Sequence, residues 1–189
     1  MKIIKFWTPK GFNGFMSNFY EAPFMLNGVI YPTNEHFFQS QKFTGTRAEQ
    51  YILMLPTAAE TAKEGKSRAL PLRKDWEEVK ETVMLTGLRA KFAQNEEIRK
   101  KLLNTGDAVL IENSPYDYYW GCGRDGSGKN RLGILLMQIR KELLIEKDTR
   151  YINDAFNEMR SLGFTAKEII ETLDEDENIN HKLLKSLTL

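Results

Sequence analysis

Two acidic side chains, Glu35 and Asp117, are of the right type to hydrolyse a glycosidic bond, because carboxyl groups can stabilise an oxocarbenium-like centre and activate water. Thr33 stands where a helix N-cap would, so Glu35 falls in the first turn of a predicted helix, whose positive end favours the ionised carboxylate. We therefore expect Glu35 to be a base or a cation stabiliser. First-turn glutamates are also common without any function, and Asp117 can equally fix a turn.

The neighbouring His36 would be an obvious acid. Consecutive helical residues point about 100° apart, so Glu35 and His36 do not readily face one site. We assign His36 to packing or hydrogen bonding.

Aromatic and basic residues are candidates for binding. Trp76 and Trp120 can stack on a flat base, although Trp76 by itself is more typical of a core. Lys42, Arg68 and Arg73 can bind phosphate oxygens, and each is also typical of a solvated surface.

The segment Gly123–Lys129 has the spacing of a phosphate-binding P-loop. Asn130 stands where a Ser or Thr is required, and an aromatic loop replaces the preceding buried strand, so the sequence argues against a nucleotide triphosphatase. A helix starting near Arg131 would still offer its positive end to an anion. The competing interpretation is a plain loop that leads into a helix.

The elements that position these residues are expected to be few strands and many helices, which predicts an α+β class. Asn27-Gly28 predicts a hairpin turn, and Asp75 with Glu78 has the form of a capping box. The expected strands are 3–7, two within 24–31 and 108–112; the expected helices are 34–43, one or two within 46–66, 76–92, 98–103 and 132–144; and 114–130 is a long loop.

The length of 189 residues allows one domain of usual size and a small appendage. After Lys147 the composition becomes polar and acidic, so we expect a domain over 1–147 and a helical extension over 148–189. The extension faintly resembles a ubiquitin-associated three-helix module, but a piece for self-association or partner binding is the preferred interpretation.

Charge and cysteine content restrict the function classes. Lys and Arg total 27 and Asp and Glu total 26, so no overall positive field attracts a nucleic acid or a membrane surface. Cys122 is the single cysteine, which excludes an internal disulfide, and no Cys/His spacing predicts a zinc site. No signal peptide is recognisable, and no apolar run approaches the roughly 18 residues of a membrane span. We expect a cytosolic protein.

Five motifs that follow one another along the chain resemble the NADAR (YbiA-like) family. The likeness covers about residues 3–146. The motifs are Ser17-Asn-Phe19, Tyr31-Pro-Thr-Asn-Glu-His-Phe-Phe-Gln-Ser-Gln-Lys-Phe43, Leu72-Arg-Lys-Asp-Trp76, Asp117-Tyr-Tyr-Trp-Gly121 and Gly128-Lys-Asn-Arg-Leu-Gly133.

The resemblance implies a compact, mostly helical α+β fold. It also implies an enzyme that cleaves N-glycosidic bonds and needs no metal or cofactor. Members act on phosphoribosylamino-pyrimidine intermediates of riboflavin synthesis or on ADP-ribose attached to guanine. By motif position, Glu35, Asp117, Trp76 and Trp120 correspond to functional residues of the family. Glu35 would steady the ribosyl cation or activate water, Asp117 would position water or ribose hydroxyls, and the tryptophans would hold the leaving base.

Further substrate contacts are expected around these residues. They are hydrogen bonds from Ser17 and Asn18, phosphate contacts from Lys42, Arg68 and Arg73, and a substrate contact at Gly121.

Three functions stay open on the sequence. The first is an N-glycosidase on a small phosphorylated ribosyl substrate, the second removes ADP-ribose from guanine in nucleic acid, and the third only senses ADP-ribose or a related nucleotide. The near-zero net charge disfavours a large polyanion. The presence of both Glu35 and Asp117 argues against a pure sensor.

Overall fold

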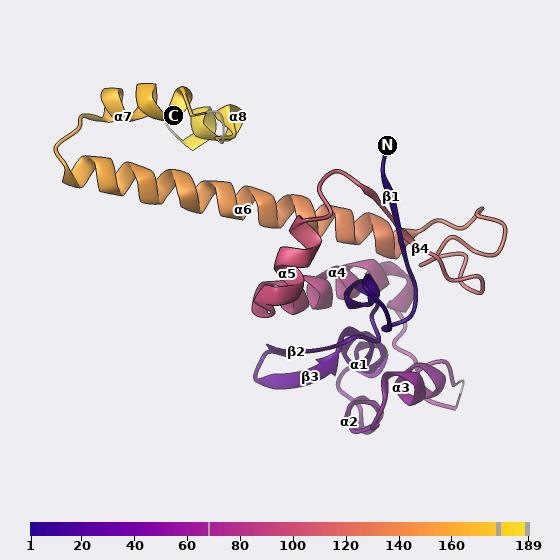
Figure 1. The fold of residues 1–189 in the computed structure, drawn as a ribbon. Coiled ribbons are helices and arrows are strands. Elements are labelled where there is room, and N and C mark those ends of the chain that lie inside the picture. Colours follow the sequence, from indigo (N-terminus) through magenta and orange to yellow (C-terminus); the bar gives the residue numbers. More distant parts are fainter. Residues whose placement is uncertain (68, 177–178, 188–189) are drawn as a thin grey trace. The chain divides into compact units, whose positions relative to one another are not determined.

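The computed structural model describes residues 1–67, 69–176 and 179–187. It divides the chain into two compact units, Met1–Ile139 and Arg140–Leu189. Helices predominate and the strands are short, which confirms the α+β class (Figure 1). No helix among the described residues is both long and apolar enough to cross a bilayer.

The strands of the first unit form two small sheets. β1 (Ile3–Phe6) pairs in parallel with β4 (Val109–Glu112), with Phe6 opposite Glu112. β2 (Glu21–Leu26) and β3 (Val29–Thr33) form the predicted antiparallel hairpin. Its turn has φ of 50° at Asn27 and 78° at Gly28, as a type I′ turn requires.

The helices of the first unit follow the hairpin. Thr33 caps α1 with its side-chain oxygen, as expected, and Thr57 caps α3 in the same way. The helices are α1 (Asn34–Ser40), α2 (Arg47–Leu53), α3 (Ala58–Glu64), α4 (Trp76–Gln94) and α5 (Glu96–Leu103), with short 3-10 helices at Gly14–Met16 and Gln41–Phe43.

The expected capping box before α4 is wrong. The Asp75 side chain makes no cap hydrogen bond. Its carboxylate instead accepts two hydrogen bonds from the Arg73 guanidinium, at 2.6 and 2.8 Å. A fork of donors two residues upstream competes successfully with a single main-chain N–H.

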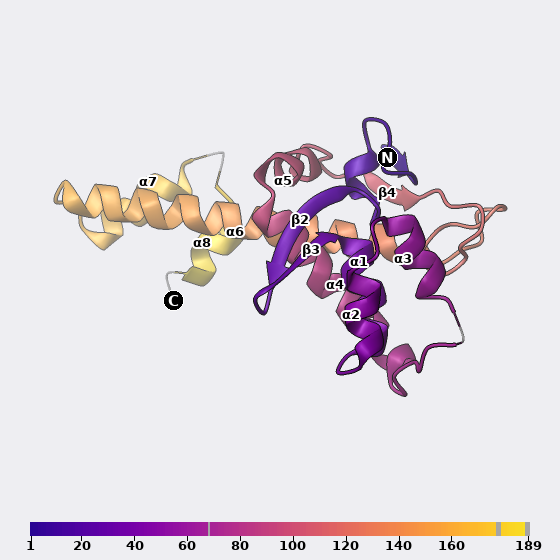
Figure 2. The same cartoon turned by 90° about the horizontal axis from the view of Figure 1, so that it is seen from below.

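An aromatic cluster fastens the hairpin to α1 and α4. Tyr31 packs edge-on against Phe37 and stacks on Phe24, with ring centroids 5.0 and 5.7 Å apart. Ala90 of α4 closes the same cluster. Figure 2 shows β2 and β3 running beside α1 and α4. This packing fixes one face of α1 and so fixes where the opposite face points.

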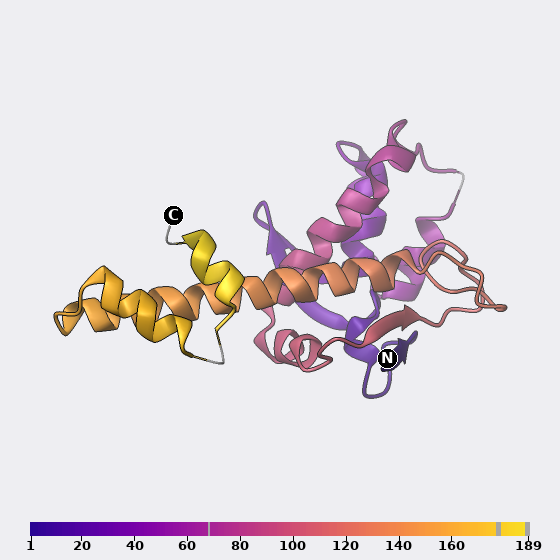
Figure 3. The ribbon, with the colours of Figure 1, turned by 90° about the horizontal axis from the view of Figure 1, so that it is seen from above.

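The first turn of α6 (Arg131–Ser161) lies against β4 (Figure 3). A Cβ atom at Gly133 would lie 2.2 Å from the carbonyl oxygen of Leu110, so only glycine permits this approach. α6 runs without a break past residue 147, beyond the expected span 132–144. The boundary between 147 and 148 stays a prediction.

The second unit has its own apolar core. α7 (Ala166–Asp174) and α8 (His181–Leu187) are among the helices predicted for the extension. Thr165 and Glu168 form a capping box for α7, and Gly163 takes a φ of 93° after α6. The core consists of Ile152, Ile169, Leu173, Ile179 and Leu184.

Candidate active site

One face of α1 and its 3-10 continuation lines a cavity of about 490 Å³ in the first unit. Glu35, Phe38, Gln39 and Lys42 are spaced i, i+3, i+4 and i+7, which places them on the same side of a helix. The other walls come from Trp7–Pro9, Ser17–Phe19, Ala62, Lys66, Met84, Glu112, Ser114, Tyr116, Asp117, Trp120 and Leu132. The volume is within the range of small-molecule sites.

Glu35 lies in this wall with only 6% of its surface exposed. Its carboxylate accepts a hydrogen bond of 2.7 Å from the Gln39 amide, one helical turn on. Burial raises the pKa of Glu35, while Gln39 and the charges of Lys42 and Lys66 act in the opposite direction. Burial is the largest of these influences, so it outweighs the ionisation that the helix end was expected to favour. A carboxylate with a raised pKa accepts protons more readily, which suits a general base.

Asp117 has a structural task and also lines the cavity. Its Oδ1 accepts hydrogen bonds from the main-chain N–H groups of Tyr119 at 2.8 Å and of Trp120 at 2.7 Å. These contacts hold Trp120 in the wall, where its ring lies edge-on to Phe38 with centroids 5.4 Å apart. These bonds confirm the turn-fixing interpretation of Asp117. Among the described residues, none hydrogen-bonds its second oxygen, so that oxygen can contact a ligand.

Two substitutions separate these tasks of Asp117. In Asp117→Asn the side-chain oxygen still accepts both hydrogen bonds, so we expect unchanged thermal stability and a loss of turnover that reflects only the charge. Asp117→Ala removes the acceptor as well and should destabilise the fold by about 1 kcal/mol. Thermal unfolding and steady-state kinetics of both variants test this. Equal turnover in Asp117→Asn and wild type would exclude a role for the charge.

Lys42 and Lys66 bring positive charge to the cavity wall. Lys42 Nζ donates to the carbonyl oxygen of Gly65 at 2.8 Å and lies 5.5 Å from the ring centre of Trp76. Burial lowers the pKa of Lys42, while the negative charge of Glu35 counteracts this. The two ammonium groups can bind a phosphate.

Ser17, Asn18, Lys42 and Trp120 thus lie in the cavity wall with the two candidate carboxylates. Asn18 is held by Asn34, whose amide donates to Asn18 Oδ1 at 2.9 Å.

Three other candidates are not in this wall, and one cannot be placed. Trp76 is buried behind Phe38, with ring centroids 5.0 Å apart, so it supports the wall from outside. Arg73 is paired with Asp75. A Cβ atom at Gly121 would lie 2.9 Å from the carbonyl oxygen of Asp117, so this glycine allows the loop to close. Arg68 lies outside the described residues.

The start of α6 does not offer the expected anion site. The N–H groups of Arg131 and Leu132 donate to the carbonyl oxygens of Tyr119 and Trp120, at 3.0 and 3.1 Å. The expectation is wrong for these donors because the loop before the helix already caps them. The Arg131 guanidinium binds both carboxylate oxygens of Glu81, which also accepts from the Tyr119 hydroxyl.

Gln39, Lys66 and Glu112 also line the cavity, although they are not among the residues predicted from the sequence. Helical spacing from Glu35 would have found Gln39, but no pattern singled out Lys66 or Glu112. Glu112 ends β4 and is 6% exposed. Burial, with the negative charge of Asp117, raises the pKa of Glu112 to about 8. Within the described ranges, no three His, Cys, Asp or Glu side chains are grouped so that they could hold a metal ion.

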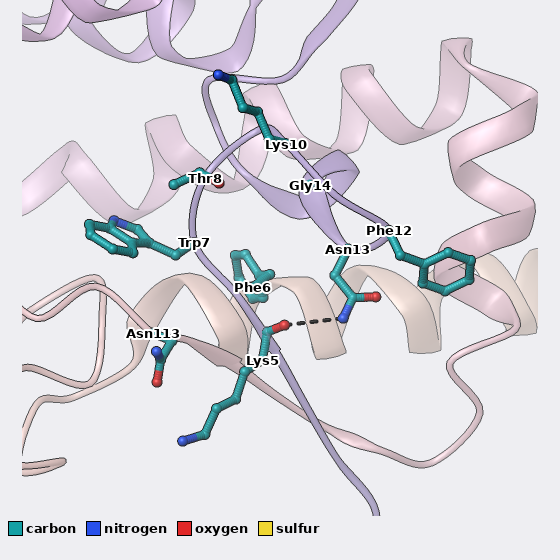
Figure 4. A pocket seen from close by; sticks show the side chains of 9 residues that line it. All are labelled: Lys5, Phe6, Trp7, Thr8, Lys10, Phe12, Asn13, Gly14 and Asn113. Carbon is teal, nitrogen blue, oxygen red and sulfur yellow. Dashed lines mark hydrogen bonds between the residues drawn. The ribbon is translucent and has the colours of Figure 1, made fainter.

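A second hollow of about 340 Å³ adjoins the cavity and shares Trp7 and Thr8 with it. Its loop is pinned by Asn13, whose amide donates to the carbonyl oxygen of Lys5 at 3.1 Å. In Figure 4 the rings of Trp7 and Phe12 point to opposite sides. They therefore do not form a common stacking surface.

Comparisons with known proteins agree on one family. The model of the NADAR domain matches residues 5–144. The N-glycosidase YbiA of Escherichia coli is 46% identical over 145 residues, which cover 77% of this chain and 91% of that protein. An N-glycosidase of Nostoc punctiforme is 39% identical over 74% of this chain and 89% of its own length. A riboflavin biosynthesis protein of Vibrio vulnificus is 38% identical over 74% of this chain and 38% of its own length. The NMR structure of Escherichia coli YbiA superposes with a TM-score of 0.72, covering 77% of this chain and 87% of that one.

Proposed function

The chain belongs to the NADAR domain family, and we propose that it hydrolyses the bond between a ribose carbon and a base nitrogen in a phosphorylated, nucleotide-like substrate. The observation that carries the proposal is the cavity itself. It joins the carboxyl groups of Glu35 and Asp117 to the ammonium groups of Lys42 and Lys66 within about 490 Å³. Carboxylates can stabilise a ribosyl cation and activate water, and ammonium groups can bind phosphate.

The residues that line the cavity have different roles in the proposed reaction. Glu35 takes a proton from the attacking water, with Gln39 holding its carboxylate in place. Asp117 orients the water or the ribose hydroxyls, together with the polar side chains of Ser17 and Asn18. The rings of Trp120 and Phe38 bind the flat base.

The substrate that we favour is a phosphoribosylamino-pyrimidine or a related small metabolite. The balance of charges, 27 basic to 26 acidic side chains, provides no general attraction for a nucleic acid. The riboflavin biosynthesis name of the Vibrio vulnificus relative points to the same class of metabolite.

The test follows released base and sugar by mass spectrometry. Wild type and Glu35→Ala are incubated with a phosphoribosylamino-pyrimidine and, separately, with DNA that carries ADP-ribose on guanine. We expect Glu35-dependent release from the pyrimidine substrate. Release from the DNA alone would assign the function to removal of ADP-ribose. Tight binding of ADP-ribose without release of base or sugar would show that the protein senses ADP-ribose and does not hydrolyse these substrates.

A further inference from the structure

A third carboxyl group, that of Glu112, lines the same cavity as Glu35 and Asp117. It comes from the end of β4, whereas Glu35 comes from α1. We propose that Glu112 is the general acid of the reaction and donates its proton to the nitrogen of the departing base. This assignment rests on the proposed function and names a catalytic residue that the motifs do not contain.

The main chain of Glu112 is held firmly on three sides. Phe6 of β1 lies opposite it in the parallel ladder. Its N–H donates to Asn130 Oδ1 at 2.9 Å, and its carbonyl oxygen accepts from the N–H of Cys122 at 2.8 Å. The Asn130 amide also donates to the carbonyl oxygen of Leu110 at 2.8 Å, so this side chain acts as a short neighbouring strand for β4. The carboxyl group is therefore carried by a rigid support.

The side chain of Glu112 contrasts with this well-bonded backbone. It is 94% buried, and the structure gives its carboxyl group no hydrogen-bond or ion-pair partner among the described residues. Buried polar groups normally have a hydrogen-bond partner, because burying such a group without a hydrogen bond costs free energy. Glu112 is largely buried and lines the cavity, and a carboxyl group that has no protein partner there is suited to bind a ligand.

The charges around the cavity decide which carboxyl group keeps its proton. Burial and the negative charge of Asp117 raise the pKa of Glu35, but the Gln39 N–H and the positive charges of Lys42 and Lys66 counteract this rise and favour the ionised form. For Glu112, no such donor or positive charge among the described residues lowers the pKa. Burial and, to a smaller extent, the negative charge of Asp117 raise the pKa of Glu112 to about 8. At neutral pH Glu112 therefore holds a proton. Different surroundings assign the acid and the base.

The proposed step balances without any further reactant. The bond between the ribose carbon and the base nitrogen breaks, and its electron pair stays on nitrogen. The Glu112 proton moves to that nitrogen, while water adds to the ribose carbon and gives a proton to Glu35. Glu112 ends as a carboxylate and Glu35 as an acid, and exchange with solvent restores both.

The test compares two substrates with the same ribose 5-phosphate and different leaving groups. One carries the native type of base nitrogen, and the other carries 4-nitrophenolate, which departs without a proton. Glu112→Gln keeps the size and shape of the side chain but has no acidic proton. We expect it to lower kcat about 100-fold on the base substrate and to leave the nitrophenyl substrate within about threefold of wild type. The fall of kcat at alkaline pH should also disappear.

Two further variants complete the design. Glu21→Gln, an exposed side chain outside the cavity, should leave both substrates unaffected. Glu35→Ala should slow both. Equal losses on the two substrates in Glu112→Gln, or no loss on either, would overturn the assignment while leaving hydrolysis itself intact. If wild type cleaves neither substrate, the proposed function fails and the role of Glu112 fails with it.

Discussion

Glu35→Gln is expected to lower kcat by about 1000-fold, which is within the range that a positioned base contributes. The amide cannot accept the proton of water and cannot carry the negative charge that faces a ribosyl cation. The fold should tolerate the change, since a glutamine oxygen can still accept the 2.7 Å hydrogen bond from Gln39. Single-turnover kinetics on the accepted substrate measure the loss.

Stability separates this chemical effect from a folding defect. Burial raises the pKa of Glu35, so the folded state keeps a proton that the unfolded chain loses above about pH 4.5. Wild type therefore loses stability as pH rises from there through the folded pKa, and Glu35→Gln does not. At pH 8 we expect the variant to melt no lower than wild type. Residues that serve function at a cost in stability behave in this way.

A matched control exists in α3. Glu60 lies, like Glu35, in the first turn of a helix capped by a threonine, but it is exposed and outside the cavity. Glu60→Gln should retain full kcat. Full turnover in Glu35→Gln would show that another group activates water. Retained affinity for ribose 5-phosphate in that variant, measured by calorimetry, would confirm that binding and chemistry are separate.

Local patterns predicted those parts of the fold that local chemistry decides. Asn27-Gly28 forms its turn because both residues tolerate positive φ, and Thr33 caps α1 because its oxygen meets the N–H three residues on. The same kind of pattern failed at Asp75. There the pairing with Arg73 competes with the cap, and a sequence pattern gives no measure of which contact is stronger.

The site shows the same division. Glu35 and Lys42 share a helix face that spacing predicts, so both are in the cavity. The position of Glu112 depends on hydrogen bonds with Asn130 and Cys122, which lie beside β4 because the long loop folds back on itself. No spacing rule reports such a contact. Conversely, Trp76 belongs to a motif yet acts from behind Phe38, since a motif marks a position without giving its distance from the ligand.

Lys91 of α4 is expected to make stability depend on pH. It is 0% exposed, and its Nζ donates to the carbonyl oxygens of Phe15 and Ser17, each at 2.8 Å. Burial lowers the pKa of Lys91 to about 7. The unfolded chain binds the proton up to about pH 10.4, so between these values the unfolded state holds more protons and the free energy of unfolding rises with pH. Below about pH 7 this contribution is constant, because both states are protonated.

Urea unfolding at pH 8.5 and 9.5 isolates the effect. The pKa of Glu112 is raised to about 8, so this residue makes the free energy of unfolding fall with rising pH mainly at pH values below 8.5. We expect wild type to gain about 1 kcal/mol over this pH unit from Lys91, since one unit of pKa difference corresponds to about 1.4 kcal/mol. Lys42 acts in the same direction, so the part due to Lys91 is the gain that Lys91→Met loses. An identical gain in both proteins would contradict the assignment.

Lys91→Met also tests whether this buried lysine supports the wall of the cavity. A neutral amine still has two N–H bonds, so deprotonated Lys91 keeps both carbonyl contacts, whereas methionine leaves both oxygens unpaired. We expect Lys91→Met to cost about 3 kcal/mol at pH 9, where wild type no longer bears the full cost of a buried charge. Those contacts hold Ser17 in the wall beside Asn18, so KM should rise even at temperatures where the variant is fully folded. The lysine is then a positioning residue that fixes the wall without touching the substrate.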